Sequence, residues 1–109
     1  MTDCLLVMTH LPDAAAAQLL AQRIIESRAA ACVNQLSPCT SIYRWQDKIE
    51  TVSEVPLLIK TSVSAYHILE ALIRAAHPYE LPEIIAVPLS AGLPEYLEWV
   101  NRETQPCKE

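Results

Sequence analysis

Residues 31–61 read ACVNQLSPCTSIYRWQDKIETVSEVPLLIKT, and they give the clearest local indication of the architecture. Two extended stretches lie on either side of a polar turn candidate, Gln46-Asp47-Lys48. Two such runs around a short polar turn are typical of an antiparallel hairpin. Pro56 has no N–H to donate to a ladder, so it predicts a bulge or a stretch of strand at a sheet edge.

This hairpin is long, because natural strands usually run about five to six residues. Its far end, Tyr43-Arg44-Trp45, carries two aromatic side chains. An extended hairpin with unpaired edges can pair with another chain. We therefore expect the hairpin to build a homo-oligomer, and the alternative is a hairpin with a solvated tip.

Strands and helices are expected on both sides of the hairpin. They are an apolar strand at 4–9, a helix from 14 to about 30, a helix ending at 76, a buried strand at 84–89 and a short helix at 96–100. The first strand is apolar enough to be buried on both faces. The order β-α-β-β-α-β plus a C-terminal helix predicts an α+β, ferredoxin-like fold with both long helices on one sheet face.

Local signals indicate how the two long helices pack and where the second one ends. Ala17, Leu20 and Ile24, together with Ala21 and Ile25, form an apolar stripe that should pack on the sheet. Ser62 is a plausible N-cap for the second helix. His77 precedes Pro78, and a residue before proline is driven out of the α region, so the second helix should end there.

The composition fits one domain across residues 1–109. The net charge is −5 and no basic patch can be read, so no nucleic-acid partner is expected. A secretion-signal pattern and an apolar run of about 18 residues are both missing, so we expect no membrane partner and a cytoplasmic location. The cysteines lack zinc-type spacing and are expected to be free thiols. They are Cys4, Cys32, Cys39 and Cys107.

Five short motifs, in this order and spacing, resemble those of the CutA family of divalent-cation-tolerance proteins. They are AACVN at 30–34, YRW at 43–45, LIKT at 58–61, HPYELPEI at 77–84 and YLEW at 96–99. The resemblance extends over about residues 4 to 103. It implies a cytoplasmic homotrimer joined through the hairpins, a link to divalent metals and especially copper, and a fold similar to the PII signalling proteins.

The sequence departs from the family pattern in two places. Asp47 stands where the family usually has glycine, and aspartate tolerates positive φ better than most residues. The proposed family metal ligands are a cysteine near the end of the first strand and a histidine pair before the proline. Here those positions read Met8 and Ala76-His77, so only His77 is a strong ligand type.

His77 is accordingly the predicted metal ligand, with copper(II) or another divalent cation as the cofactor. The alternative role is a helix-terminal histidine that hydrogen-bonds the last carbonyls. His10 and His67 are expected at the surface. Lys60 would need a carboxylate partner if buried, and Glu54 or Glu83 could supply it.

The same residues suggest a ligand pocket between subunits. Its predicted lining is Trp45, Lys60, His77, Tyr79 and Glu83. The alternative is an ion-paired trimer interface, because pockets and interfaces share this composition.

Three functional hypotheses follow. The first is a non-enzymatic trimer that binds divalent metal. The second is a PII-like sensor that binds a small anion or nucleotide between subunits. Gly92 is the only glycine, so side chains such as Lys60 would have to hold a phosphate. The third is an enzyme using His77 with Glu80 or Glu83, and it has the least support because no oriented nucleophile is evident.

Overall fold

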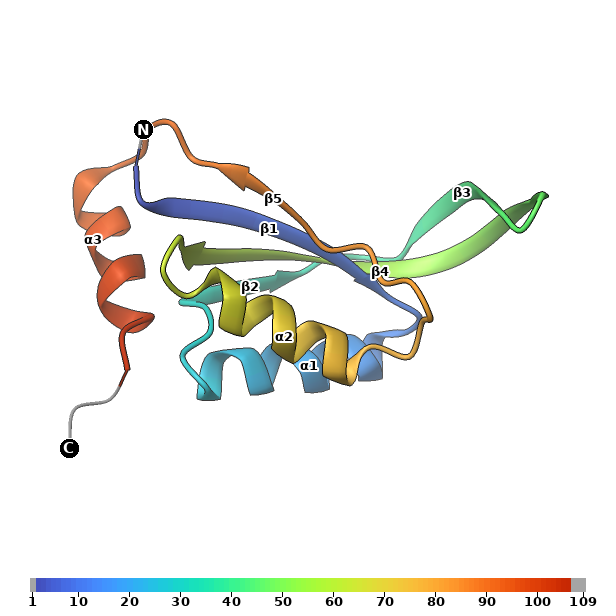
Figure 1. Ribbon diagram of the computed structural model, residues 1–109, viewed down its shortest axis with the longest axis horizontal. Coiled ribbons are helices and arrows are strands. Elements are labelled where there is room, and N and C mark those ends of the chain that lie inside the picture. Colours follow the sequence, from blue (N-terminus) through green and yellow to red (C-terminus); the bar gives the residue numbers. More distant parts are fainter. Residues whose placement is uncertain (1, 107–109) are drawn as a thin grey trace.

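The computed structural model describes residues 2–106, and the helices and strands follow the predicted order (Figure 1). The elements are β1 (Cys4–Leu11), α1 (Ala14–Glu26), β2 (Cys32–Gln35), β3 (Cys39–Trp45), β4 (Lys48–Ser62), α2 (Tyr66–Ala76), β5 (Ile85–Pro88) and α3 (Pro94–Glu103). Cys4, Cys32 and Cys39 are free thiols, as expected, and Cys107 lies outside the described residues. No helix in this range is long and apolar enough to cross a membrane.

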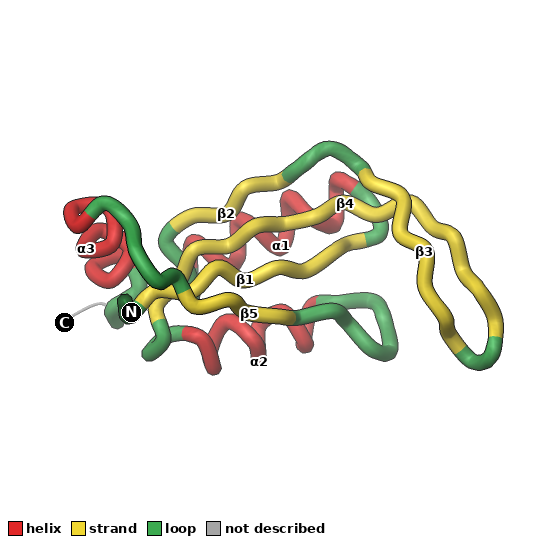
Figure 2. Tube along the Cα trace, turned by 90° about the horizontal axis from the view of Figure 1, so that it is seen from above, coloured by secondary structure: helices red, strands yellow, loops and turns green. Residues whose placement is uncertain are grey.

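The sheet is antiparallel, with strand order β2-β4-β1-β5, and β3 pairs with the outer half of β4. Val7 of β1 lies opposite Ile59 of β4, which lies opposite Val33 of β2. Helices α1 and α2 lie side by side against one face of the sheet (Figures 1 and 2). This arrangement confirms the predicted α+β, ferredoxin-like fold with an extra C-terminal helix.

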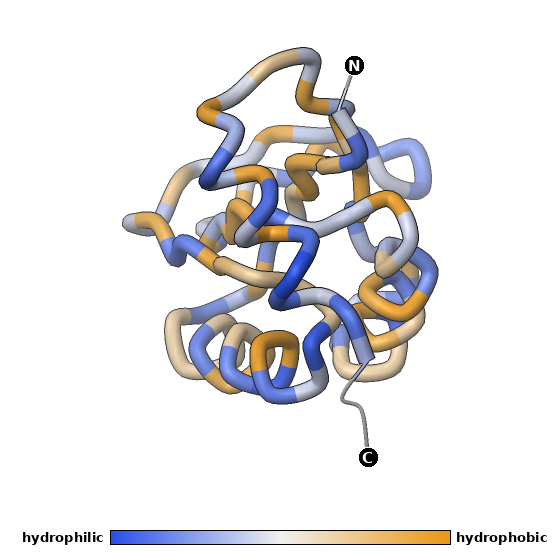
Figure 3. Tube along the Cα trace, turned by 90° about the vertical axis from the view of Figure 1, so that its left-hand side faces the viewer, coloured by the Kyte–Doolittle hydropathy of each residue, from blue (hydrophilic) through white to orange (hydrophobic). Residues whose placement is uncertain are grey.

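The hydrophobic core fills the layer between the sheet and the two helices. Val7 and Ile59 are fully buried on the sheet side. Of the predicted stripe of α1, Ala17, Leu20 and Ile24 are buried against them, whereas Ile25 is 42% exposed and lies outside the buried face. The end view in Figure 3 shows hydrophobic and hydrophilic segments alternating along the helices, as expected when each helix buries one face.

The outer part of the hairpin, residues 39–54, projects from the sheet as a two-stranded arm (Figure 2). At its tip Gln46 and Asp47 have φ of 49° and 66°, so the positive φ expected at Asp47 is confirmed. At its base, three residues (36–38) face two (55–56) between the two paired segments. The bulge predicted at Pro56 is therefore present, and the Pro56 carbonyl accepts the Leu36 N–H at 3.0 Å.

Helix α1 is shorter than predicted, because it ends at Glu26 and not near Ala30. Arg28 adopts a φ of 62°, which turns the chain out of the helix. The Ala31 N–H then donates to the Lys60 carbonyl at 2.9 Å, so this segment joins the sheet edge. Helix propensity favours alanine wherever it occurs and could not place this boundary.

The burial expected for the apolar strands β1 and β5 is also wrong. β1 alternates between buried and partly exposed residues, and β5 is exposed throughout, with Ile85 and Val87 each 49% exposed. The cause is that α1 and α2 cover only one face of the sheet, and β5 lies at the end of the strand order.

The start of α2 differs from the prediction by one turn. Ser62 is the last residue of β4, and the helix begins at Tyr66. Ser62 Oγ still accepts the Ala65 N–H at 3.2 Å, so it caps the turn that leads into α2. The predicted end of α2 is confirmed, since His77 has an extended conformation with φ of −76° and ψ of 134°.

Candidate functional site

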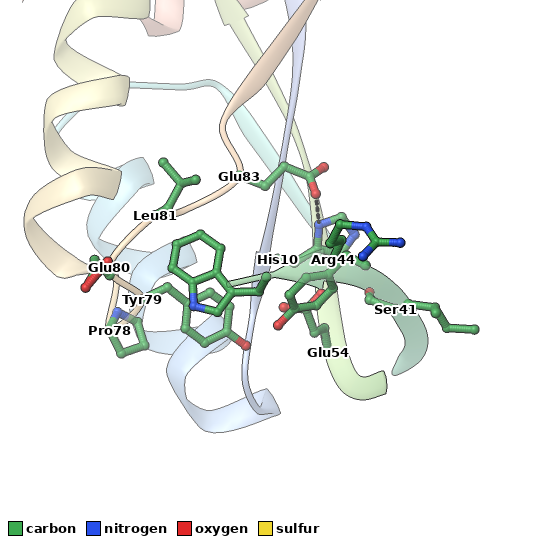
Figure 4. Close-up of a pocket in the computed structure, with 12 residues that line it drawn as sticks. His10, Ser41, Arg44, Glu54, Pro78, Tyr79, Glu80, Leu81 and Glu83 are labelled. Carbon is green, nitrogen blue, oxygen red and sulfur yellow. Dashed lines mark ion pairs between the residues drawn. The ribbon is translucent and has the colours of Figure 1, made fainter. Parts of the chain in front are cut away.

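A cleft of about 770 Å³ lies between the arm and the loop at 78–83 that joins α2 to β5. The arm supplies Ser41, Ile42, Tyr43, Arg44, Trp45 and Glu54, the loop supplies Pro78, Tyr79, Glu80, Leu81 and Glu83, and β1 supplies His10. Figure 4 shows the loop residues Pro78, Tyr79 and Glu80 on one side, with Ser41, Arg44 and His10 on the other. This volume is within the range of small-molecule sites, about 300–1,000 Å³.

His77 holds the loop against β1 through both of its ring nitrogens. Nε2 lies 2.6 Å from the His10 carbonyl oxygen, and Nδ1 accepts the Tyr79 N–H at 3.2 Å. A carbonyl has no proton to give, so Nε2 carries the proton and Nδ1 is the bare nitrogen. The side chain is 8% exposed, and neither nitrogen keeps a free lone pair for a metal.

Tyr79 stands between His77 and the cleft. Its ring centroid is 4.7 Å from that of His77. Burial, followed by the interaction of the hydroxyl with the Glu54 carboxylate, raises the pKa of Tyr79 to about 12. Glu54 is 6% exposed, so the cleft contains a nearly buried carboxylate beside a neutral phenol.

His10 and Glu83 form the second polar pair of the cleft (Figure 4). His10 Nδ1 lies 3.3 Å from Glu83 Oε1, and the two side chains are 16% and 47% exposed. Nδ1 itself is buried and has no other polar partner among the described residues. His10 is therefore a partly buried residue of the cleft, which corrects its expected place at the surface.

Lys60 lies outside the cleft, which changes the predicted residue set. Its ammonium group contacts the Asn34 side-chain oxygen and lies 4.0 Å from Cys32 Sγ, so its partner is an amide and not Glu54 or Glu83. Along β4, Lys60 is four residues from Pro56, which pairs with the cleft residue His10 of β1. At about 3.3 Å per residue this is a separation of about 13 Å.

Of the five predicted pocket residues, three line the cleft: Trp45, Tyr79 and Glu83. His77 is not part of the lining, but it contacts the ring of Tyr79. Sequence reasoning missed Glu54 as a lining residue because its burial depends on the loop, which comes more than twenty residues later in the chain. The Tyr43-Arg44-Trp45 motif was the available signal for the arm side of the cleft.

The described residues contain no cluster of three or more histidine, cysteine, aspartate or glutamate side chains able to hold a metal. Met8, at the proposed family cysteine position, pairs with Leu58 and Ile85 in the sheet. Ala76 has no donor atom, and both nitrogens of His77 are engaged. The described residues of one chain therefore do not fit a resident copper ion.

A sequence model of the CutA1 divalent ion tolerance protein matches residues 5–103. The chain belongs to the CutA1 family. Among curated CutA1 relatives, the divalent-cation tolerance protein CutA of Thermus thermophilus is 41% identical over 98 residues, which cover 90% of this chain and 95% of that protein. Protein CutA of Mus musculus is 45% identical over 94 residues, which cover 86% of this chain. The match spans only 53% of the mouse protein, so this chain corresponds to about half of that protein's length.

Solved CutA structures agree with this assignment. CutA of Xylella fastidiosa superimposes with a TM-score of 0.92 at 45% identity, covering 95% of this chain and all of that one. The PII-like protein CutA of Nostoc sp. PCC 7120 in apo form gives a TM-score of 0.87 at 34% identity, covering 93% and 97% of the two chains. The family resemblance seen in the sequence motifs is confirmed.

Proposed function

We propose that this CutA1 family protein is a cytoplasmic homotrimer that acts in divalent-cation tolerance without catalysing a reaction, with copper(II) as the metal. The observation that supports the assembly part is the sheet face that α1 and α2 leave uncovered. Leu6 and Met8 alternate with the buried Val7 and so point to that face, and Ile85 and Val87 of the neighbouring strand are each 49% exposed.

The arm adds a second apolar surface. Ile42 and Ile49 are each 69% exposed, although both are large aliphatic residues. Covering such surface between copies is favourable by about 25 cal/mol per Å². The edge strand β5 and the arm also offer unpaired backbone groups to a neighbouring chain.

Light scattering at micromolar concentration tests the assembly. We expect the mass of three chains for the wild type and a smaller mass for Ile49→Asp, which places a charge on the arm. Ser53→Asp, on the same face of β4 but without an apolar side chain to lose, is the matched control. A wild-type monomer would contradict the proposal.

Because residues 2–106 of one chain include no three-ligand cluster, the proposal places copper at ligands from more than one subunit. Calorimetric titration of copper(II), with zinc(II) as comparison, should give saturable binding to the trimer and none to a monomeric Ile49→Asp variant. A copper ion at His77 would have to displace the Tyr79 N–H from Nδ1. Loss of copper binding in an assembled His77→Ala variant would place the ion there, and equal binding by trimer and monomer would contradict a shared site.

A second candidate function is PII-like binding of a small molecule followed by signalling to a partner. The cleft of about 770 Å³ favours it, and the Nostoc relative is named as PII-like. Here the cleft, and not a metal, would be the sensing element. Saturable, metal-independent binding of a small molecule to the cleft would support this candidate.

A further inference from the structure

We infer that the cleft binds an organic ammonium cation, and not the small anion or nucleotide that a PII-like fold suggests. The inference rests on the second candidate function, in which the cleft is occupied by a small molecule. Three properties of the cleft lead to it: its charge, its aromatic walls and the arrangement of its carboxylates.

The charge of the lining is negative. Glu54, Glu80 and Glu83 line the cleft, and Arg44 is the only lysine or arginine among the described residues of its lining. His10 Nδ1 lies 3.3 Å from Glu83 Oε1, so this nitrogen is not a free donor for an anion. Lys60, the residue that was expected to hold a phosphate, lies outside the lining. A phosphate would meet like charge here, whereas a cation would be attracted.

Aromatic rings make up much of the rest of the lining. Tyr43 and Trp45 come from the arm, and Tyr79 faces them from the loop. Tyrosine and tryptophan rings attract cations to their faces, by about 0.5–2 kcal/mol per contact depending on desolvation. Alkylammonium groups suit such rings because they are weakly hydrated and apolar on the outside. A bare phosphate gains nothing from an aromatic face.

The carboxylates are placed for an organic cation and not for a metal ion. Glu54 is 6% exposed and beside the Tyr79 hydroxyl, whereas Glu83 is beside His10 at 3.3 Å. The described carboxylates therefore do not converge with a third ligand on one point, as metal coordination requires. Separated charges on an aromatic cleft of about 770 Å³ match a molecule with spaced polar and apolar groups.

The test uses the full-length protein as assembled in solution, with tetramethylammonium and spermidine as cationic probes. The neutral comparison is tert-butanol, which has nearly the shape of tetramethylammonium but no charge. ATP and inorganic phosphate are the anionic comparisons. Chemical-shift titration should show saturable binding of the cations at least about tenfold tighter than of tert-butanol, a factor worth 1.4 kcal/mol. Binding should weaken as salt is raised, because it is partly electrostatic.

Two variants assign the site. Glu54→Gln keeps the shape of the side chain and removes its charge, and Trp45→Ala removes one aromatic wall. Each should weaken cation binding at least about threefold. Glu98→Gln, an exposed position on α3 outside the cleft, is the matched charge control and should bind like the wild type. If Glu54→Gln does not assemble, Glu83→Gln replaces it, since Glu83 is 47% exposed.

The outcomes separate the inference from the function on which it rests. Saturable ATP or phosphate binding at the cleft without cation binding would overturn the ammonium inference and leave the PII-like candidate standing. No saturable binding of any probe would overturn both. Cation binding that is unchanged in both cleft variants would also overturn the inference, because the site would then lie elsewhere.

Discussion

Replacing His77 by alanine should lower the free energy of unfolding by about 2–3 kcal/mol. The variant loses the bond from Nε2 to the His10 carbonyl and the bond from the Tyr79 N–H to Nδ1, which measure 2.6 and 3.2 Å. A buried polar group left without its partner costs about 1–3 kcal/mol. Both bonds are only partly buried, so each group can regain some water and should cost near the lower end of this range. The two groups together then give about 2–3 kcal/mol.

The matched control is His67→Ala on the same helix, because His67 is exposed. It should change stability by no more than about 0.5 kcal/mol, as surface substitutions usually do. The assay is equilibrium urea unfolding of wild type and both variants at one fixed protein concentration, since assembly makes stability depend on concentration. A His77→Ala loss no larger than that of the control would refute the assignment of His77 as the clamp between the loop and β1.

Three further predictions address the cleft, the turn and the core. Tyr79 has a pKa raised from 10 to about 12 by burial and by Glu54. Because the pKa in the folded state lies above that in the unfolded state, the contribution of Tyr79 to stability is present below pH 10 and is lost as pH rises towards 12. Tyrosinate absorbance during an alkaline titration should show this late ionisation, and Glu54→Gln should move it towards 10; an unchanged titration would contradict the pairing. Asp47→Gly should raise the unfolding free energy by about 0.5 kcal/mol, because glycine adopts the φ of 66° without strain, and Asp47→Val should lower it; urea unfolding that shows the opposite order would disprove the turn argument. Ile59→Ala should cost about 2–5 kcal/mol in the same assay because Ile59 is fully buried, and a loss under 1 kcal/mol would contradict its place in the core.

Periodic and turn signals were enough to predict most of the fold. The 3.6-residue repeat of Ala17, Leu20 and Ile24 correctly predicted the centre of the buried face of α1, although Ile25 of the same stripe is 42% exposed. Pro56 correctly marked a bulge, and Asp47 correctly marked a positive-φ turn. These signals succeed because they reflect the backbone conformations that proline and aspartate allow and the tendency of apolar side chains to be buried, which are local properties of the sequence.

The candidate site was predicted less completely. Trp45, Tyr79 and Glu83 were placed in one pocket from their motifs, and the structure brings them together. Glu54 was considered only as a partner of Lys60, and His10 was assigned to the surface. Both errors concern contacts between segments that are far apart in the chain, which sequence spacing does not encode.

The sequence by itself determined the order of strands and helices, the bulge and turn of the arm, and the family. These follow from hydrophobic periodicity, proline and turn chemistry, and motifs that are read along the chain. Only the tertiary structure decided that His77 uses both ring nitrogens to bond backbone groups of His10 and Tyr79, and that Lys60 contacts Asn34 outside the lining of the cleft. The reason is that a side chain's free lone pairs and charge partners depend on which distant segment folds against it.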